Sequence, residues 1–152
     1  MFGRQNLVKA VIVVGTFILC TLGMSAAVQA EDILDGNIRN QQTGRCLDHF
    51  EGNPLTDTCH NQSSQLWWLH RWRDNTWELK HHNTGWCLDD SFEEGLRSYD
   101  CNRTRWQSWY IRTWRDGTKE YRNQATGRCL DDNWVDGLHV RPCNRLTWQS
   151  WW

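Results

Sequence analysis

Beyond residue 30 the sequence has few aliphatic side chains and no long apolar run. No stretch repeats apolar residues with the 3.6-residue period of a helix, so the sequence excludes a helical bundle and favours many short strands. The lack of a second apolar run also excludes membrane insertion by this part of the chain. Twelve tryptophans take the place of the missing aliphatics. Because an aromatic side chain buries on the order of 150–250 Å², a few of them can fill the centre of a small domain.

An excess of positive charge is also lacking. Without Arg4 and Lys9, the 17 basic residues fall to 15 against 18 acidic ones, which gives a net charge of −3. Nucleic-acid binding depends on many Lys and Arg side chains that neutralise phosphates, so this balance argues against such a partner. The mixed surface offers no polybasic patch for acidic lipids either.

The first thirty residues differ in kind from the rest. A short basic region precedes an almost wholly apolar run from Ala10 to Gly23, and small residues then lead up to Ala30. This order predicts a secretory signal peptide over residues 1–30, because the apolar run is short for a bilayer core of about 30 Å. We expect the mature chain, residues 31–152, to form one domain and to be secreted or periplasmic.

The remaining sequence repeats itself three times. Each copy contains a cysteine, five further residues and then Gln-x-Trp followed by an aromatic, and the copies begin at Cys59, Cys101 and Cys143. An earlier Gly-x-Cys-Leu-Asp motif recurs in step with them. Tandem motifs of this kind indicate structural units that pack on one another. We place these units at about residues 36–77, 78–118 and 119–152.

Turn-forming residues recur at matching positions along the repeats. A Thr-Gly pair before each first cysteine predicts a turn whose glycine has a positive φ, and Asp-Asn or Asp-Gly pairs between copies predict hairpins. Together with the missing helical period, these signals predict an all-β domain. The residues concerned are Gly44, Gly85 and Gly127 in the first set, and Asp74-Asn75 and Asp116-Gly117 in the second.

Six cysteines follow residue 31, and an even number in an exported chain predicts a disulfide framework. Six cysteines allow 15 pairings, but threefold repetition favours one bridge inside each copy. Each bridge would close a loop of about 14 residues and contribute about 3 kcal/mol. Zinc is the weaker alternative, since neither Cys-x-x-Cys nor clustered histidines occur. The expected pairs are Cys46–Cys59, Cys87–Cys101 and Cys129–Cys143.

The tryptophan of each Gln-x-Trp motif is predicted to lie in the core. The glutamine two positions earlier is expected to bond to backbone groups, because a polar group beside a buried ring needs a partner. The third copy stops soon after its motif, and the segment Ile33–Gly36 resembles the missing end. We therefore expect this segment to lie beside Trp152 and to close a ring of three units.

Three Gln-x-Trp motifs in step with three Gly-x-Cys-Leu-Asp motifs, over Ile38 to Trp152, resemble the ricin B-type lectins. The resemblance is closest to the trefoil carbohydrate-binding modules of bacterial glycoside hydrolases. It implies a β-trefoil of three units of about 40 residues, each with four strands and one shallow sugar site. It implies neither catalysis nor a cofactor, and no metal.

The family's sugar site combines an Asp after the first cysteine, an aromatic ring two residues before the second, and polar groups near Gln-x-Trp. A carboxylate accepts hydrogen bonds from adjacent hydroxyls, and a ring packs on the apolar face of the sugar. The second unit matches best, with Asp89, Tyr99 and Asn102 in contact and Gln107 in support. In the first unit the matching residues are Asp48 and Gln65, with Asp57 in place of the ring. In the third unit they are Asp131, Asn144 and Gln149, with Arg141 in place of the ring.

Other interpretations remain open at this stage. The aspartates can instead bond to backbone amides, as short acids often do, and Phe50, Phe92 or Trp134 can supply the ring. An enzyme is disfavoured, because the six histidines share no register across the copies and no Gly-x-Ser-x-Gly motif occurs. The paired acids also make a poor carboxylate pair for glycoside hydrolysis.

The sequence thus predicts an exported, disulfide-stapled protein that binds glycans or polysaccharide. Shallow sites of this kind gain affinity through multivalency. The alternative is a tryptophan-rich trefoil that binds a separate protein chain, as a toxin accessory subunit or inhibitor, with degenerate sugar sites.

Overall fold

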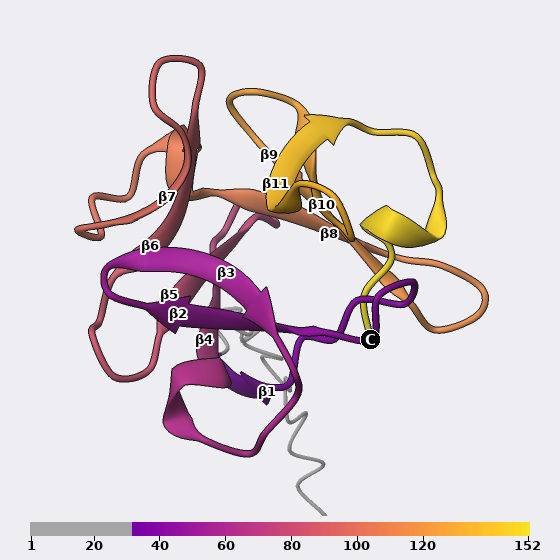
Figure 1. Cartoon of the computed structure of the whole chain (residues 1–152). Helices are drawn as coiled ribbons and strands as arrows, with labels where there is room; N and C mark the ends of the chain where they lie inside the picture. Colours follow the sequence, from indigo (N-terminus) through magenta and orange to yellow (C-terminus); the bar gives the residue numbers. More distant parts are fainter. Residues whose placement is uncertain (1–31) are drawn as a thin grey trace, which may run out of the picture.

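The computed structural model describes residues 32–152, and this part of the chain consists of short strands joined by turns (Figure 1). Unit one contains β1 (Asp32–Gly36), β2 (Cys46–Phe50), β3 (Asn53–Asp57) and β4 (Leu66–Arg71). Unit two contains β5 (Trp77–His81), β6 (Cys87–Ser91), β7 (Gly95–Tyr99) and β8 (Trp109–Thr113). Unit three contains β9 (Lys119–Asn123), β10 (Arg128–Asn133) and β11 (Gly137–Pro142). Three single-turn 3-10 helices accompany them: η1 (Ser63–Gln65), η2 (Arg105–Gln107) and η3 (Thr147–Gln149).

The all-β prediction is confirmed over the described residues. Within residues 32–152 no helix has the length and apolar character needed to cross a membrane. The predicted signal peptide lies outside the described residues.

Six segments form a closed barrel: β1, β4, β5, β8, β9 and the C-terminal segment around Trp151. Strands β4 and β5 pair across one hairpin, β8 and β9 pair across the next, and β5 meets β8 between them. Strand β1 pairs with β4 at one side. At the other side Trp151 bridges to Lys119 and to Asn40, and the backbone of Trp152 exchanges hydrogen bonds of 2.8 and 3.3 Å with Arg39. The C-terminus therefore lies beside the start of unit one (Figure 1).

This closure differs from the predicted one. Ile33–Gly36 was expected beside Trp152, but these residues belong to β1, which pairs along β4 from Gly36 opposite Leu66 to Ile33 opposite Leu69. The expected partner was wrong because β1 extends along the strand of its own unit. It is the next few residues of the chain, Arg39 and Asn40, that reach the C-terminal tryptophans.

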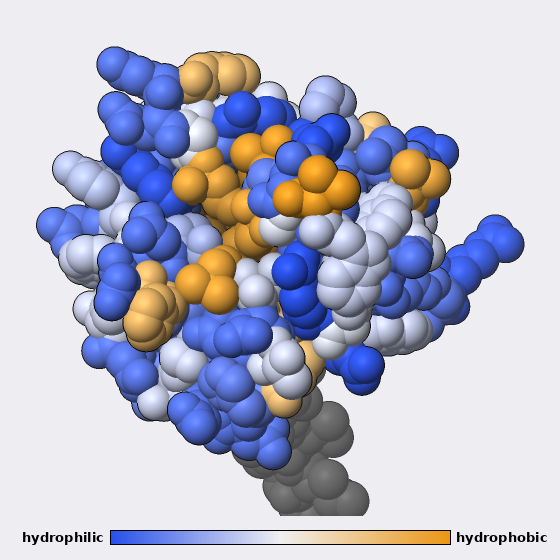
Figure 2. Space-filling model, viewed as in Figure 1, coloured by the Kyte–Doolittle hydropathy of each residue, from blue (hydrophilic) through white to orange (hydrophobic). Residues whose placement is uncertain are grey.

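The second and third strands of each unit form a hairpin at one end of the barrel. These hairpins are β2–β3, β6–β7 and β10–β11, and β3, β7 and β11 contact one another where the units meet. Figure 2 shows apolar side chains gathered near the centre of this face with polar ones around them. Leu96, Leu138 and Val140 on these hairpins pack against the core. A six-stranded barrel capped by three hairpins is a β-trefoil, as the resemblance implied.

The core is built from the same positions in each unit. Trp67, Trp109 and Trp151 are fully buried, which confirms the core prediction. Each indole Nε1–H donates to the carbonyl of the Leu that follows the first cysteine, at 3.0 to 3.3 Å. The rings therefore fill the centre without leaving a buried donor unpaired.

Local details of the units also match expectation. All three disulfides join the predicted partners. The Thr-Gly turn glycines have φ of 70 to 71°, and Asn75 and Gly117 have φ of 66° and 88° in the hairpin turns. Each motif glutamine is buried and accepts, on Oε1, the backbone N–H of the residue after the second cysteine, at 2.8 Å. Its Nε2 donates to the carbonyl of the residue before that cysteine, so the glutamine side chain holds the backbone on both sides of the second cysteine.

Candidate functional site

Every unit brings the same three positions together beside its hairpin. The Asp after the first cysteine lies on the hairpin's first strand, where the register sets Asp48 opposite Leu55, Asp89 opposite Arg97 and Asp131 opposite His139. All three aspartates are buried. The position two residues before the second cysteine is the last or the last but one residue of the hairpin's other strand. The loop clamped by the motif glutamine follows it.

In unit two an arginine occupies the centre of the predicted site. The Nε–H of Arg97 donates to Asp89 Oδ1 at 3.1 Å, and the guanidinium carbon lies 4.4 Å from the centroid of the Tyr99 ring. Asp89 and Tyr99 therefore both contact Arg97, which uses the carboxylate and the ring. Asn102 lies nearby on an exposed loop, where its Oδ1 accepts two hydrogen bonds from Thr104.

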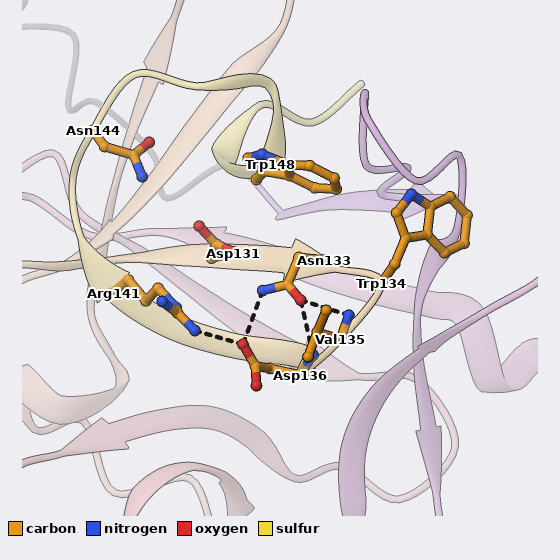
Figure 3. Close-up of a pocket in the computed structure, with 8 residues that line it drawn as sticks. All are labelled: Asp131, Asn133, Trp134, Val135, Asp136, Arg141, Asn144 and Trp148. Carbon is orange, nitrogen blue, oxygen red and sulfur yellow. Dashed lines mark hydrogen bonds and ion pairs between the residues drawn. The ribbon is translucent and has the colours of Figure 1, made fainter.

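Unit three has an open hollow of about 440 Å³ at the same place. Figure 3 shows the indole rings of Trp148 and Trp134 on one side of it, with Arg141 on β11 and Asp136 in the hairpin turn on the other side and Asp131 between them. Trp134 is 63% exposed at the hairpin tip, and Trp148 is half-buried on η3. The residues that line the hollow are Asp131, Asn133, Trp134, Val135, Asp136, Arg141, Asn144 and Trp148.

The polar groups around this hollow contact one another. Arg141 donates to Asp136 at 2.5 Å and to His139 Nε2 at 2.6 Å, so this nitrogen is an acceptor. Asp131 Oδ1 lies 3.0 Å from the same nitrogen and receives no proton from it. Arg141 is thereby held along the strand, outside the space between Asp131 and the two indoles (Figure 3). The Arg45 guanidinium lies over one face of the Trp134 ring, 5.2 Å from its centroid, so a ligand at the Asp131 carboxylate would use the other face of Trp134 and the Trp148 ring.

Trp148 was not predicted as a binding residue. The signal was present, since Trp106 and Trp148 stand directly before the motif glutamine, where the ricin B-type pattern commonly has Asn. In unit two the equivalent rings, Phe92 and Trp106, contact each other edge to face at 5.9 Å. The ring pair of unit three has no such contact among the described residues.

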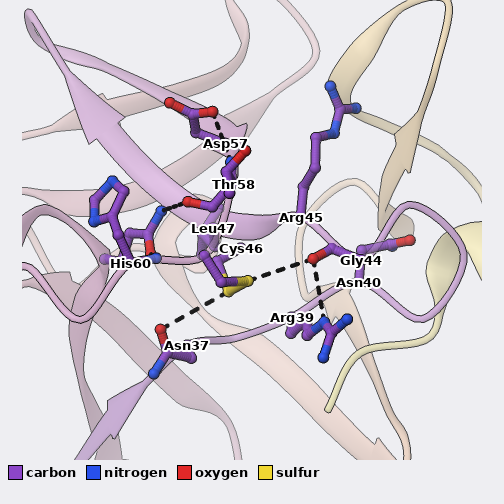
Figure 4. Close-up of a disulfide and its surroundings, with 12 residues drawn as sticks. Asn37, Arg39, Asn40, Gly44, Arg45, Cys46, Leu47, Asp57, Thr58 and His60 are labelled. Atoms are coloured by element: carbon purple, nitrogen blue, oxygen red, sulfur yellow. Dashed lines mark hydrogen bonds between the residues drawn. A yellow bond between two sulfur atoms is a disulfide. The ribbon is translucent and has the colours of Figure 1, made fainter.

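Unit one has the least suitable arrangement for ring stacking. Asp57 takes the position of the ring, and Phe50 lies at the hairpin tip, 64% exposed. Asp48 lies 3.3 Å from His60 Nε2, and it accepts hydrogen bonds from Gln65 Nε2 and from a backbone N–H. Figure 4 shows Asp57 and His60 on the segments that flank the Cys46–Cys59 disulfide.

Potential metal-binding groups are few in the described part of the chain. Two of the three clusters of ligand-type side chains contain disulfide-bonded cysteines, which cannot act as thiolate ligands. The third is the ion-paired group of Asp48 and His60 with Asp57 beside it. We assign no metal to these groups.

Comparison with known proteins supports the β-trefoil fold. Residues 35–98 match the family model of the ricin-type beta-trefoil lectin domain-like proteins. The match covers 64 of the 152 residues, so this part of the chain is similar to the ricin-type lectin-like domains. No curated protein sequence matches it significantly.

Solved structures show a similar fold over all three units. The designed threefold-symmetric protein ThreeFoil aligns over 74% of this chain and 92% of its own, with a TM-score of 0.68 and 19% identity. The hemolytic lectin CEL-III aligns over 76% of this chain with a TM-score of 0.63 and 25% identity. Cytolethal distending toxin from Actinobacillus actinomycetemcomitans aligns over 80% of this chain and 88% of its own, with a TM-score of 0.64 and 16% identity. This chain spans 29% of the CEL-III chain.

Proposed function

We propose that this protein binds carbohydrate through the hollow of unit three. The supporting observation is the pair of indole rings, Trp134 and Trp148, beside the carboxylate of Asp131. A sugar presents an apolar C–H face and adjacent hydroxyls, so it fits a ring platform next to a charged acceptor. The similarity to a hemolytic lectin is consistent with this ligand class.

The three units contribute unequally in this proposal. Unit two has the predicted residues Asp89, Tyr99 and Asn102, but a sugar there must displace Arg97 from both its partners. Unit one lacks a ring at the stacking position, where Asp57 stands. Unit three is therefore the primary site, and binding to polymeric glycans gains from further copies of the protein on the same surface.

A glycan array probed with the disulfide-bonded chain tests the proposal. Trp134→Ala and Asp131→Asn should each abolish the signal of the bound glycans, because one removes the platform and the other the charged acceptor. Phe50→Ala is the matched control, since Phe50 is the exposed ring at the hairpin tip of unit one. Near-UV circular dichroism confirms that each variant is folded. Binding that survives both unit-three substitutions, or no binding at all, contradicts the proposal.

We also propose that the protein works outside the cytoplasm, after removal of residues 1–30. The three disulfides support this, because such bonds persist in oxidising compartments. N-terminal sequencing of the exported protein should begin at Glu31. A retained N-terminus would contradict it.

A protein partner is the second candidate. Exposed rings such as Trp134 favour it, because aromatic side chains are enriched at protein interfaces. A protein interface depends on buried aromatic area more than on one carboxylate. On this reading Trp134→Ala weakens the complex and Asp131→Asn leaves it intact, whereas sugar binding is lost in both variants.

A further inference from the structure

The units meet at three interfaces, which we call seams. Two of the three seams contain the same Arg–Asp ion pair, which we call the clasp. Where unit three meets unit two, the guanidinium of Arg128 binds the carboxylate of Asp90 and the carbonyl of Ser91. Where unit one meets unit three, Arg45 binds Asp132 at 2.5 and 3.1 Å. Both aspartates are fully buried, and each also accepts from the threonine two residues before the clasp arginine.

The seam between units one and two has no such clasp. Trp86 takes the position of the arginine, directly before the first cysteine, and His49 takes the position of the aspartate. The His49 ring stacks on the His81 ring with centroids 4.4 Å apart, and it meets Trp86 edge-on at 5.9 Å. A neutral aromatic stack therefore replaces an ion pair at this seam alone.

Both histidines are enclosed. His49 is 6% exposed and His81 is 2% exposed. Their Nε2 atoms are buried and make no hydrogen bond within residues 32–152. A ring with an unpaired buried nitrogen tolerates the neutral form much better than the charged one.

His81 also replaces an asparagine with a defined task. In the other units Asn40 and Asn123 accept turn N–H groups on Oδ1. His81 imitates this with Nδ1, which accepts the Thr84 N–H at 3.4 Å and lies 2.9 Å from Thr84 Oγ1. An accepting Nδ1 requires the neutral ring with its proton on Nε2. Protonation would turn Nδ1 into a second donor facing the Thr84 N–H.

The charges around the pair do not offset this cost. Burial is the main cause that lowers the pKa of His49, and the charge of Asp48 opposes it only in part. Burial also lowers the pKa of His81, and the charges of His49 and His82 lower it further. The backbone of Ser64 and the charge of Asp48 act in the opposite direction, but the net shift is downward. Asp48 itself is already engaged by His60.

The sign of the pH effect follows from these directions. Because the folded pKa values lie below the unfolded value of about 6.5, the unfolded chain binds more protons as pH falls through that value. The stability that the neutral pair contributes is complete above pH 6.5 and is lost progressively below it.

We propose that the seam between units one and two is an acid-sensitive joint. At neutral pH the stacked, uncharged His49–His81 pair holds the β2–β3 hairpin against the turn that contains Thr84 and Trp86. In acid, two adjacent imidazolium cations repel each other and break the His81–Thr84 bond, so this seam opens. The Arg45–Asp132 and Arg128–Asp90 clasps keep the other two seams closed. The inference is independent of the proposed sugar site.

The other units supply the substitutions for a test. The triple variant His49→Asp, His81→Asn and Trp86→Arg installs the clasp found at the other seams. Between pH 7.5 and 5.0 the Tm of the unaltered protein should fall by roughly 5 °C, because the unfolded chain takes up protons that the buried pair does not. The triple variant should lose most of this fall. His70→Gln, at an exposed pair with Asp32, is the control and should keep it.

A second measurement covers the case in which the triple variant does not fold. NMR titration of the unaltered protein should give pKa values below 6.5 for His49 and His81. Hydrogen exchange at pH 5.0 should rise in residues 46–57 and 81–86 and remain slow in the equivalent parts of unit three. A titration of either histidine at or above 6.5, or equal exchange at all three seams, overturns the proposal.

Discussion

Arg97 shows how one side chain can decide the use of a site whose other residues are all present. Asp89 and Tyr99 lie where the family pattern requires them, yet the guanidinium between them bonds to one and stacks on the other. In unit three the equivalent residue is His139, which reaches the Asp131 carboxylate with a flat ring and leaves the hollow open. The residue opposite the aspartate therefore decides whether the site is occupied by a protein side chain, as by Arg97 in unit two, or is open, as beside His139 in unit three.

Replacing Arg97 with Ala should open the site of unit two. The variant frees the Asp89 carboxylate and the Tyr99 ring, so isothermal titration calorimetry with a glycan bound by unit three should give about twice the number of sites. Some stability is lost, because a buried carboxylate loses its partner. Arg105→Ala, at an exposed arginine on η2, is the control and should leave the number of sites unchanged. An unchanged stoichiometry for Arg97→Ala would show that this arginine does not block the site.

At the scale of elements, each unit is a hairpin and a loop held together by short-range links. Disulfides join residues 13 or 14 positions apart, and the buried glutamine clamps the loop on both sides of the second cysteine. The single-turn η1, η2 and η3 were not predicted, because one turn is too short to produce a periodic pattern. Their buried glutamines explain why the turn forms where it does.

Removal of one disulfide should weaken the whole domain. In the double variant Cys87→Ala and Cys101→Ala, the unfolded chain regains the freedom of a 14-residue loop, which costs about 3 kcal/mol of the free energy of unfolding. Urea denaturation followed by tryptophan fluorescence measures this loss. The corresponding variant of unit three should give a similar loss, since its loop has the same length. A loss well under 1 kcal/mol in both would show that the bridges do not constrain the unfolded chain.

At the scale of the whole molecule, closure of the barrel depends on a few residues at the C-terminus. Trp151 bridges to both Asn40 and Lys119, and Trp152 exchanges two backbone hydrogen bonds with Arg39. These contacts join strands far apart in sequence. They also place the first and last units side by side, as the seam formed by Arg45 and Asp132 requires.

Deletion of Trp152 tests this closure. The loss of two backbone hydrogen bonds should cost about 2 kcal/mol, a fall in Tm of roughly 8 °C by differential scanning calorimetry. Trp152→Ala is the control, because it keeps the backbone and removes only a half-exposed ring. If the deletion and the substitution lower Tm equally, the side chain and not the backbone closure is responsible.

The sequence alone was sufficient for the threefold repeat, the three disulfides and the buried tryptophans, and its resemblance to the ricin B-type lectins implied the β-trefoil. These features recur three times in the same register, and a recurrence of that kind leaves a readable pattern. Tertiary structure alone decided the partner of β1, the contacts of Arg97 with Asp89 and Tyr99, the hollow beside Trp134 and Trp148, and the stacking of His49 on His81. Each of these depends on where a side chain or strand lies relative to another hairpin strand, loop or unit. The physical reason is that such packing breaks the repeat: a single arginine or histidine carries no periodic signal, and its role is set by the neighbours that folding brings to it.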